Sequence, residues 1–189
     1  MRVIAGQYRS RRLRSLPGMD IRPTSDRLRE TLFNVLTAGS PEALAGSVWL
    51  DLFAGTGAVG IEALSRGADA VYFVESSPRA AEVIRENLRS LGIREGFEVN
   101  EREVPRALRL LDSQAIAPSH VFLDPPYSMQ EAYDETLGFL SQSRLLGDHT
   151  IVIAEHEKKF DPGERFGSLL RSRLLKQGDA ALSFYRRGA

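Results

Sequence analysis

The stretch that most constrains this chain runs from Val48 to Gly60, V-W-L-D-L-F-A-G-T-G-A-V-G, where an apolar run stops at an acid and opens into glycines. Residues 48 to 53 predict a strand buried on both faces of a parallel sheet. Gly55 and Gly57 then permit a tight turn, after which Ala58 is predicted to begin a helix. This order leaves backbone N–H groups at a helix N-terminus, where they can bind an anionic or polar part of a nucleotide-type cofactor.

The glycines alone leave the cofactor open, because G-T-G-A-V-G also fits the dinucleotide pattern G-x-G-x-x-G. Glu75 lies 20 residues after Gly55 and would accept hydrogen bonds from ribose hydroxyls in NAD enzymes and in S-adenosylmethionine enzymes alike. Asp51 favours the second class, since a carboxylate before the turn suits a cationic amino-acid moiety and would crowd a pyrophosphate. We therefore favour S-adenosyl-L-methionine over a dinucleotide. A glycine turn that merely closes a tight strand-to-helix connection is a further alternative.

Composition limits the remaining choices. A chain of 189 residues suits one α/β domain plus an arm, and 42% hydrophobic with 26% charged residues is ordinary for a soluble protein. No apolar run approaches the ~20 residues of a membrane span, and the N-terminus lacks signal-peptide character, so we expect a cytoplasmic protein without membrane contact. The absence of cysteine excludes disulfides and thiolate metal sites, and the three histidines lack metal-ligand spacing. We expect no metal.

The net charge of zero conceals an uneven distribution. Residues 1 to 30 contain eight arginines against three acids, whereas the rest of the chain holds 17 basic and 22 acidic side chains. A basic arm on an acidic body is typical of a protein that holds a phosphate backbone with one part and does chemistry with another. Arginine favours bidentate phosphate contacts. A solvated basic tail is the alternative interpretation.

We expect residues 1–22 to form a basic arm or short β-hairpin and residues 23–189 to form the main domain. Pro23 ends the arm, and Thr24 or Ser25 can cap a helix. Within that helix, apolar residues recur at helical spacing, so Arg27 and Arg29 are predicted to project away from the buried stripe.

Beyond the glycine turn, strands alternate with helices. Strands are predicted at 70–75, 97–99, 120–123 and 150–155, helices at 78–91, 104–111 and 130–146, and a hairpin at 169–186. This pattern predicts an α/β fold with a mostly parallel, seven-stranded sheet, helices on both faces and an antiparallel C-terminal hairpin. Ligands of such sheets bind outside the carboxyl ends of the strands. Four acids lie at such ends: Asp51, Glu75, Glu103 and Asp124.

The most specific feature is Asp124-Pro125-Pro126-Tyr127, directly after the strand at 120–123. Two prolines fix an extended, rigid loop that holds an acid, a carbonyl and an aromatic ring together. These groups suit methylation of a planar amino group. Asp124 and the Pro125 carbonyl would accept its N–H hydrogens while Tyr127 stacks on the ring, which aligns the nitrogen lone pair with the methyl group. A structural Pro-Pro turn is the alternative.

Together, D-L-F-A-G-T-G, Glu75 and D-P-P-Y resemble the Rossmann-like class I S-adenosylmethionine-dependent methyltransferases that act on exocyclic amino groups. R-V-I-A-G-Q-Y-R-S-R-R-L and R-P-T-S-D-R-L-R-E-T-L-F-N-V-L resemble the RsmD-type bacterial 16S ribosomal RNA guanine-N2 methyltransferases, and the likeness covers nearly the whole chain. It implies a catalytic loop at residues 124–127. It also implies these cofactor contacts: Asp51, Phe53, Ala54, Gly55, Thr56, Gly57, Glu75, Ser76, Glu103 and Val104.

The resemblance further implies a substrate in 16S ribosomal RNA of the small subunit or its assembly intermediate, which fits the arginine arm. Candidate phosphate contacts are Arg9, Arg11, Arg12, Arg22 and Arg27. Other targets stay open, namely adenine-N6 of DNA and a protein glutamine, because D/N-P-P-Y motifs serve those as well. A further alternative is a non-catalytic RNA-binding assembly factor. We expect a monomer.

Overall fold

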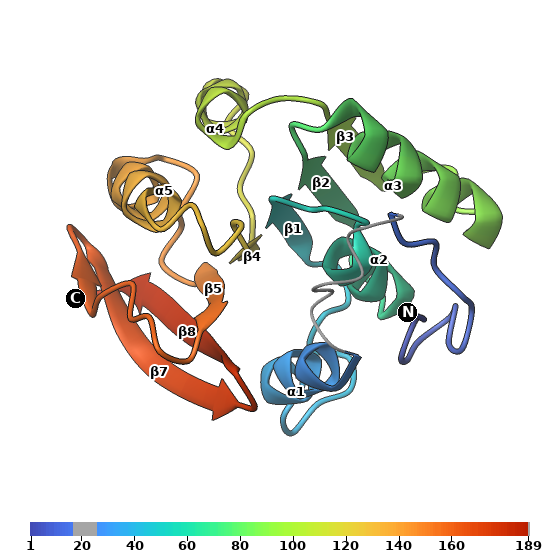
Figure 1. Cartoon of the computed structure of the whole chain (residues 1–189), viewed down its shortest axis with the longest axis horizontal. Helices are drawn as coiled ribbons and strands as arrows, with labels where there is room; N and C mark the ends of the chain where they lie inside the picture. Colours follow the sequence, from blue (N-terminus) through green and yellow to red (C-terminus); the bar gives the residue numbers. More distant parts are fainter. Residues whose placement is uncertain (17–25, 189) are drawn as a thin grey trace.

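The computed structural model describes residues 1–16 and 26–188 and shows a single mixed sheet flanked by helices (Figure 1). Its helices are α1 (Asp26–Leu36), α2 (Ala58–Ser65), α3 (Pro78–Leu91), α4 (Val104–Ser113) and α5 (Glu131–Gln142). Its strands are β1 (Val48–Leu52), β2 (Ala70–Val74), β3 (Phe97–Asn100), β4 (His120–Leu123), β5 (Ile151–Glu157), β6 (Arg165–Phe166), β7 (Leu169–Gln177) and β8 (Ala180–Arg187).

The sheet has the order β3-β2-β1-β4-β5-β8-β7-β6. The first five strands in this order are parallel, and β8, β7 and β6 join them antiparallel. The predicted α/β class, the parallel half and the C-terminal hairpin are confirmed. The strand count differs, since the sheet has eight described strands where seven were predicted. The extra strand is β6, whose two residues are too short to leave a pattern in the sequence.

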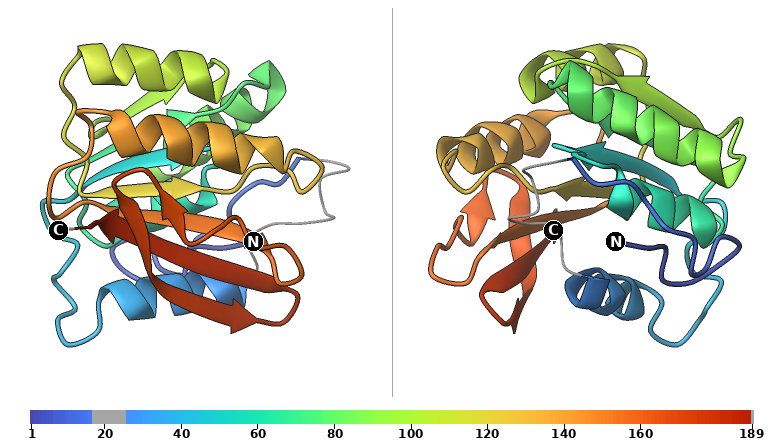
Figure 2. Two further views of the ribbon diagram at one scale, coloured as in Figure 1. Left: turned by 90° about the vertical axis from the view of Figure 1, so that its left-hand side faces the viewer. Right: turned by 45° about the vertical axis from the view of Figure 1, so that its right-hand side comes forward.

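Helices cover both faces of the sheet (Figure 2). One apolar cluster joins α1, α2 and α3 to one face around Trp49 and Phe73, and the other joins α4 and α5 to the opposite face around Leu50 and Tyr133. Residues of β1 alternate between the two clusters, as a strand buried on both faces requires. None of the helices in the described part of the chain has the length and apolar character of a membrane span.

Helix boundaries follow local chemistry. The prediction for α3 is confirmed at both ends, where the Ser77 side chain accepts the Ala80 N–H and Gly92 ends the helix with φ 76°. The predicted helix at 130–146 was too long, because α5 ends at Gln142. Ser143 is extended, and its hydroxyl donates to Asp112 at 2.7 Å, which turns the chain away from the helix axis.

The prediction that Arg29 projects away from the core was wrong. Its side chain is completely buried, with a guanidinium nitrogen donating to the Arg2 carbonyl and, at 3.0 Å, to Asp26. Glu62 of α2 supplies the buried countercharge, with Arg29 Nε 3.9 Å from its Oε2. Helical periodicity alone predicts the Arg29 charge at the surface, but Glu62, from a segment distant in sequence, compensates this charge in the interior. Arg27 is exposed, as predicted.

The N-terminal residues 1–16 fold back on themselves and lie against α2 and α3 (Figure 1). One antiparallel bridge joins Arg2 to Arg12, and Val3 and Leu13 enter the cluster beneath α1. Glu62 accepts the backbone N–H groups of Ile4 and Ala5 at 2.8 and 3.0 Å. The arm is therefore anchored by buried contacts along its length. The predicted boundary at residue 22 lies outside the described residues, as does the predicted cap at Thr24 or Ser25.

Candidate active site

The glycine turn after β1 has the conformation that its sequence requires. Gly55 and Gly57 have φ of 56° and 77°, and Gly57 stands at the N-terminus of α2. A Cβ at Gly57 would approach Ile84 and Phe73 to 3.2 Å, so the turn packs closely against α3 and β2. Phe53 adopts φ 59°, which is unusual for a bulky residue and is typical of functional sites.

Glu75, directly after β2, holds this turn in place. Its Oε2 accepts the Gly55 N–H at 2.8 Å, and its Oε1 accepts the Ser77 N–H at 2.8 Å. The carboxylate thus bridges the glycine turn and the start of α3. Carboxylate oxygens accept more than one hydrogen bond each, so these contacts leave capacity for ribose hydroxyls.

Asp51 lies at the end of β1 and is 2% exposed. Its Oδ2 accepts the N–H of Gly60 in the first turn of α2 at 2.9 Å. Burial raises the pKa of this carboxyl to about 7, assisted by the negative charge of Glu75, while the hydrogen bond from Gly60 opposes the rise. Because the pKa of this buried carboxyl lies near neutral pH, a cationic ligand beside it would stabilise its ionised form and would bind favourably to it.

The Asp124-Pro125-Pro126-Tyr127 loop leaves the sheet at the same edge. Leu123 of β4 pairs with Leu52 of β1, and the Asp124 N–H donates to the Leu52 carbonyl at 3.4 Å. The Met129 N–H donates to the Pro126 carbonyl at 2.7 Å, which closes the loop before α5. Asp124 and Tyr127 are partly exposed, so both can meet a ligand above the sheet edge.

The remaining predicted cofactor residues occupy the rim of this edge. Ala54 and Thr56 are partly exposed members of the glycine turn, and Ser76 is exposed between β2 and α3. Glu103 is exposed at the N-terminus of α4, where its side chain makes no capping hydrogen bond, and Val104 is buried beside it. Their roles as cofactor contacts stay predictions.

Asn87 is a structural link that the sequence did not reveal. Its side chain is completely buried in α3, accepts the Arg14 N–H at 2.7 Å and donates to the Thr56 carbonyl at 3.0 Å. One amide thus ties the arm to the glycine turn. The motif D-L-F-A-G-T-G predicts the turn, but no local pattern identifies Asn87, 31 residues after Thr56, as the side chain that binds it.

The candidate RNA contacts differ in surroundings. Arg9 and Arg12 are exposed on the arm, and Arg27 is exposed on α1. Arg11 is exposed too, although its guanidinium donates to the Ser90 carbonyl at 2.8 Å. Arg22 lies outside the described residues. Contact of these arginines with RNA remains a prediction.

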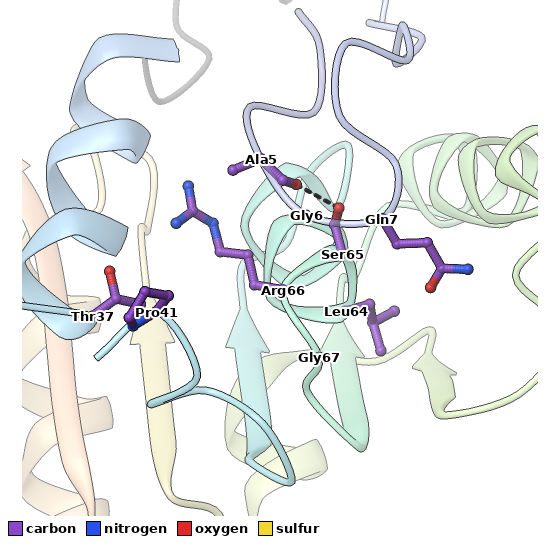
Figure 3. A pocket seen from close by; sticks show the side chains of 9 residues that line it. All are labelled: Ala5, Gly6, Gln7, Thr37, Pro41, Leu64, Ser65, Arg66 and Gly67. Atoms are coloured by element: carbon purple, nitrogen blue, oxygen red, sulfur yellow. Dashed lines mark hydrogen bonds between the residues drawn. The ribbon is translucent and has the colours of Figure 1, made fainter.

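A cavity of about 540 Å³ lies at the other end of α2, away from the glycine turn (Figure 3). Its lining includes Gly6, Ser65 and Arg66, and the Ser65 hydroxyl donates to the Ala5 carbonyl at 2.6 Å. A Cβ at Gly6 would approach the Ser65 carbonyl oxygen to 1.8 Å, so the arm contacts α2 closely there. The cavity borders the arm and is separate from the edge that holds Asp51 and Asp124.

Comparisons with known proteins agree with this geometry. The family model described as "Conserved hypothetical protein 95" matches residues 1–186. The Bacillus subtilis protein named "Putative rRNA methyltransferase YlbH" is 32% identical over 187 residues, 99% of each chain. "Ribosomal RNA small subunit methyltransferase D" of Escherichia coli K12 is 34% identical over 157 residues, 83% of this chain and 75% of the relative.

A solved structure shows the same fold. It is described as "Putative methyltransferase yhhF from Escherichia coli", has a TM-score of 0.83 and 30% identity, and covers 100% of this chain and 98% of its own. The predicted Rossmann-like methyltransferase fold is confirmed, and S-adenosyl-L-methionine is the cofactor, as predicted. On these matches, the chain belongs to the RsmD-type family of ribosomal RNA methyltransferases.

Proposed function

We propose that this chain transfers a methyl group from S-adenosyl-L-methionine to the exocyclic N2 amino group of a guanine in 16S ribosomal RNA of the small subunit. The observation that carries the proposal is the adjacency of two loops. The glycine turn follows β1, the Asp124 loop follows β4, and Leu52 pairs with Leu123 at the ends of those two strands. A methyl donor over one loop and an amino group over the other would lie next to each other.

The residues present fit the cofactor. Asp51 would face its cationic amino-acid part, Glu75 would accept its ribose hydroxyls, and the N–H groups of the glycine turn would bind its polar atoms. Glu103 and Val104 would flank the adenine at the start of α4. When bound, the cofactor supplies an electrophilic methyl group.

The protein's own part in the reaction is to position the amino group. The Asp124 carboxylate and the Pro125 carbonyl accept hydrogen bonds from the two N–H groups of this amino group, and the Tyr127 ring stacks on the guanine. These contacts direct the nitrogen lone pair along the line of displacement, so proximity and alignment supply most of the rate. No strong base is required, because the proton leaves after the nitrogen has acquired the methyl group.

RNA as the substrate is supported by charge and by relatives. The arm carries exposed arginines, and its backbone at Arg14 is joined through Asn87 to the glycine turn. The relatives from Escherichia coli and Haemophilus influenzae are named for methylation of the small ribosomal subunit. A guanine within structured RNA must leave its stack to reach the Asp124 loop, and phosphate contacts made by arginines would hold the backbone meanwhile.

A transfer assay separates the candidate functions. Labelled S-adenosyl-L-methionine is supplied with small ribosomal subunits from a strain that lacks the corresponding methyltransferase, with duplex DNA, or with protein extract. We expect the label in RNA. Label in DNA or protein would replace the proposed target with adenine-N6 or glutamine. Cofactor binding with no transfer to any of the three would indicate an RNA-binding assembly factor.

A further inference from the structure

The C-terminal part of the chain carries a second concentration of positive charge. Residues 158–188 contain eight basic side chains against three acidic ones, while residues 31–157 contain nine basic against 19 acidic. This excess is as large as that of the N-terminal arm, and it lies on the β7–β8 hairpin and the loop before it. The left view of Figure 2 shows this hairpin in front of the rest of the sheet.

Most of this charge is not neutralised within the protein. Arg171 is the exception, because it pairs with Asp161 at 2.5 Å and with Glu164 at 3.3 Å. The six exposed cations of the segment form no ion pair within the described residues. They are Lys158, Lys159, Arg165, Arg173, Lys176 and Arg186.

Three of these side chains belong to the same edge of the sheet as the Asp124 loop. β8 is antiparallel to β5, so the turn between β7 and β8 lies at the carboxyl end of β5. Lys176 of β7 pairs with Ala181, which pairs with His156 of β5, and the Lys158 N–H donates to the Asp179 carbonyl of the turn at 2.8 Å. We name Lys158, Lys159 and Lys176 the lysine corner.

The lysine corner also adjoins the catalytic loop through packed rings. Phe160, two residues after Lys158, contacts Tyr133 with ring centroids 5.2 Å apart. Tyr133 lies in the first turn of α5, directly after the loop that contains Asp124 and Tyr127, and its hydroxyl donates to the Glu155 carbonyl at 2.7 Å. The lysine corner is therefore fixed relative to the catalytic loop.

The order of the sheet determines what the lysine corner can reach. The cofactor residues lie over β1, β2 and β3, the catalytic loop lies over β4, and the lysine corner follows over β5, β8 and β7. A base held at Asp124 thus has the cofactor on one side and the lysines on the other. Its flanking backbone can extend over the lysines without covering the cofactor residues.

We propose that the lysine corner is a second RNA-binding surface, which holds backbone phosphates next to the target nucleotide on the side away from the cofactor. This inference rests on the proposed function and adds a contact surface that the arginine arm does not provide. Lysine on an exposed strand also discourages edge-to-edge pairing of sheets. That explanation does not cover Lys158 and Lys159, which lie in a loop beyond β5.

The test compares two triple variants of the full chain. The first replaces the lysine corner (Lys158→Gln, Lys159→Gln, Lys176→Gln). The matched control removes three exposed charges from elsewhere (Arg94→Gln, Arg109→Gln, Arg144→Gln). For each, the affinity for unmodified small ribosomal subunits is measured across a range of salt concentrations, together with the affinity for S-adenosyl-L-methionine.

Because each phosphate contact contributes about 0.7–0.9 to the salt slope, we expect the lysine variant to lower that slope by about 2 and to weaken binding by about tenfold or more near 0.15 M salt. The control should match the wild type, and cofactor affinity should be unchanged in both variants. A slope and affinity equal to those of the control would overturn the proposal and leave only Lys176 with a role, in protection of the exposed strand β7 from edge-to-edge pairing.

A second contradicting result is a lysine variant that binds small ribosomal subunits as the wild type does but loses binding to anionic lipid vesicles. That result would likewise overturn the proposal and assign the lysine corner to a membrane surface. Failure of the proposed function can be distinguished from failure of this inference. In the first case the wild-type protein would transfer no methyl group to the subunits in the transfer assay. In that case the affinity measurement still shows whether the lysine corner binds RNA.

Discussion

Arg29 of α1 and Glu62 of α2 are both completely buried, and Arg29 Nε lies 3.9 Å from Glu62 Oε2. Glu62 also accepts Arg66 Nε at 2.8 Å and two backbone N–H groups of the arm. Desolvation lowers the pKa of Arg29, and the charge of Glu62 opposes that shift. One carboxylate thus joins the arm, α1 and α2.

Replacing Glu62 with Gln should strongly destabilise the protein. The change removes the charge that compensates Arg29 and turns an amide group toward donors, and breaking such a buried pair costs about 3–5 kcal/mol. Urea denaturation measures the loss. The control Glu86→Gln removes a pair with Arg14 that is largely exposed, which should cost less than about 1 kcal/mol. Equal losses would show that the Glu62 network contributes little.

Two helical glycines differ in the space around them, so their replacement by alanine should have opposite effects on stability. A Cβ at Gly60 would lie 2.3 Å from a Phe73 ring carbon and 2.7 Å from a Val71 methyl, so Gly60→Ala should destabilise the fold by about 1–3 kcal/mol. Gly138→Ala in α5 meets nothing within 4 Å and should stabilise the protein by about 0.5–1 kcal/mol. Thermal denaturation of both variants is the measurement. A neutral Gly60→Ala would contradict the packing argument.

The pKa of Asp51, raised to about 7 by burial, predicts a pH dependence of stability. Without cofactor, the folded protein keeps a proton on Asp51 up to about pH 7, whereas the unfolded chain releases it near 3.8. The free energy of unfolding should therefore fall as pH rises across that interval through this group. Asp51→Asn should reduce that slope, and an unchanged slope would contradict the raised pKa.

The same pKa predicts a pH dependence of cofactor affinity. A cationic ligand binds the ionised carboxylate, so the affinity for S-adenosyl-L-methionine should be roughly tenfold weaker near pH 6 than near pH 8. Titration calorimetry at both values tests this. Asp51→Asn should bind weakly at both, and a wild-type affinity independent of pH would exclude Asp51 as the partner of the cationic group.

The catalytic loop predicts a separation between binding and chemistry. Asp124→Ala should reduce methyl transfer by about a hundredfold or more, because the amino group loses an oriented acceptor in the transition state. Cofactor affinity should stay near the wild-type value. Asp134→Ala, an exposed acid at the start of α5, is the control and should retain activity. Equal loss of cofactor binding and transfer would mean that the Asp124 loop is structural.

The strands and the site edge were predictable because their signals are local. Each buried strand is a short apolar run, and the acids that follow these runs reach one edge because parallel strands share a direction. Asp51, Glu75 and Asp124 could therefore be placed together from the sequence. Nothing local distinguished the Gly60 N–H as the partner of Asp51, because that contact depends on how α2 packs.

The buried charges and the lysine corner were not predictable for two different reasons. Arg29 is compensated by Glu62, a residue 33 positions away, so helical periodicity alone assigned it to the surface. The lysine corner was not predicted because a charge count over residues 31–189 is negative overall, since most of the acids lie in residues 31–157. Only the register of β5, β8 and β7 brings those lysines to the catalytic edge.

The most direct test of the proposed function is the chemical identity of the product. Unmodified small ribosomal subunits are incubated with the wild-type protein and S-adenosyl-L-methionine, the RNA is digested to nucleosides, and the methylated nucleoside is identified by mass spectrometry. We predict N2-methylguanosine, absent when Asp124→Ala replaces the wild type. N6-methyladenosine, or no methylated nucleoside despite intact cofactor binding, would contradict the proposal.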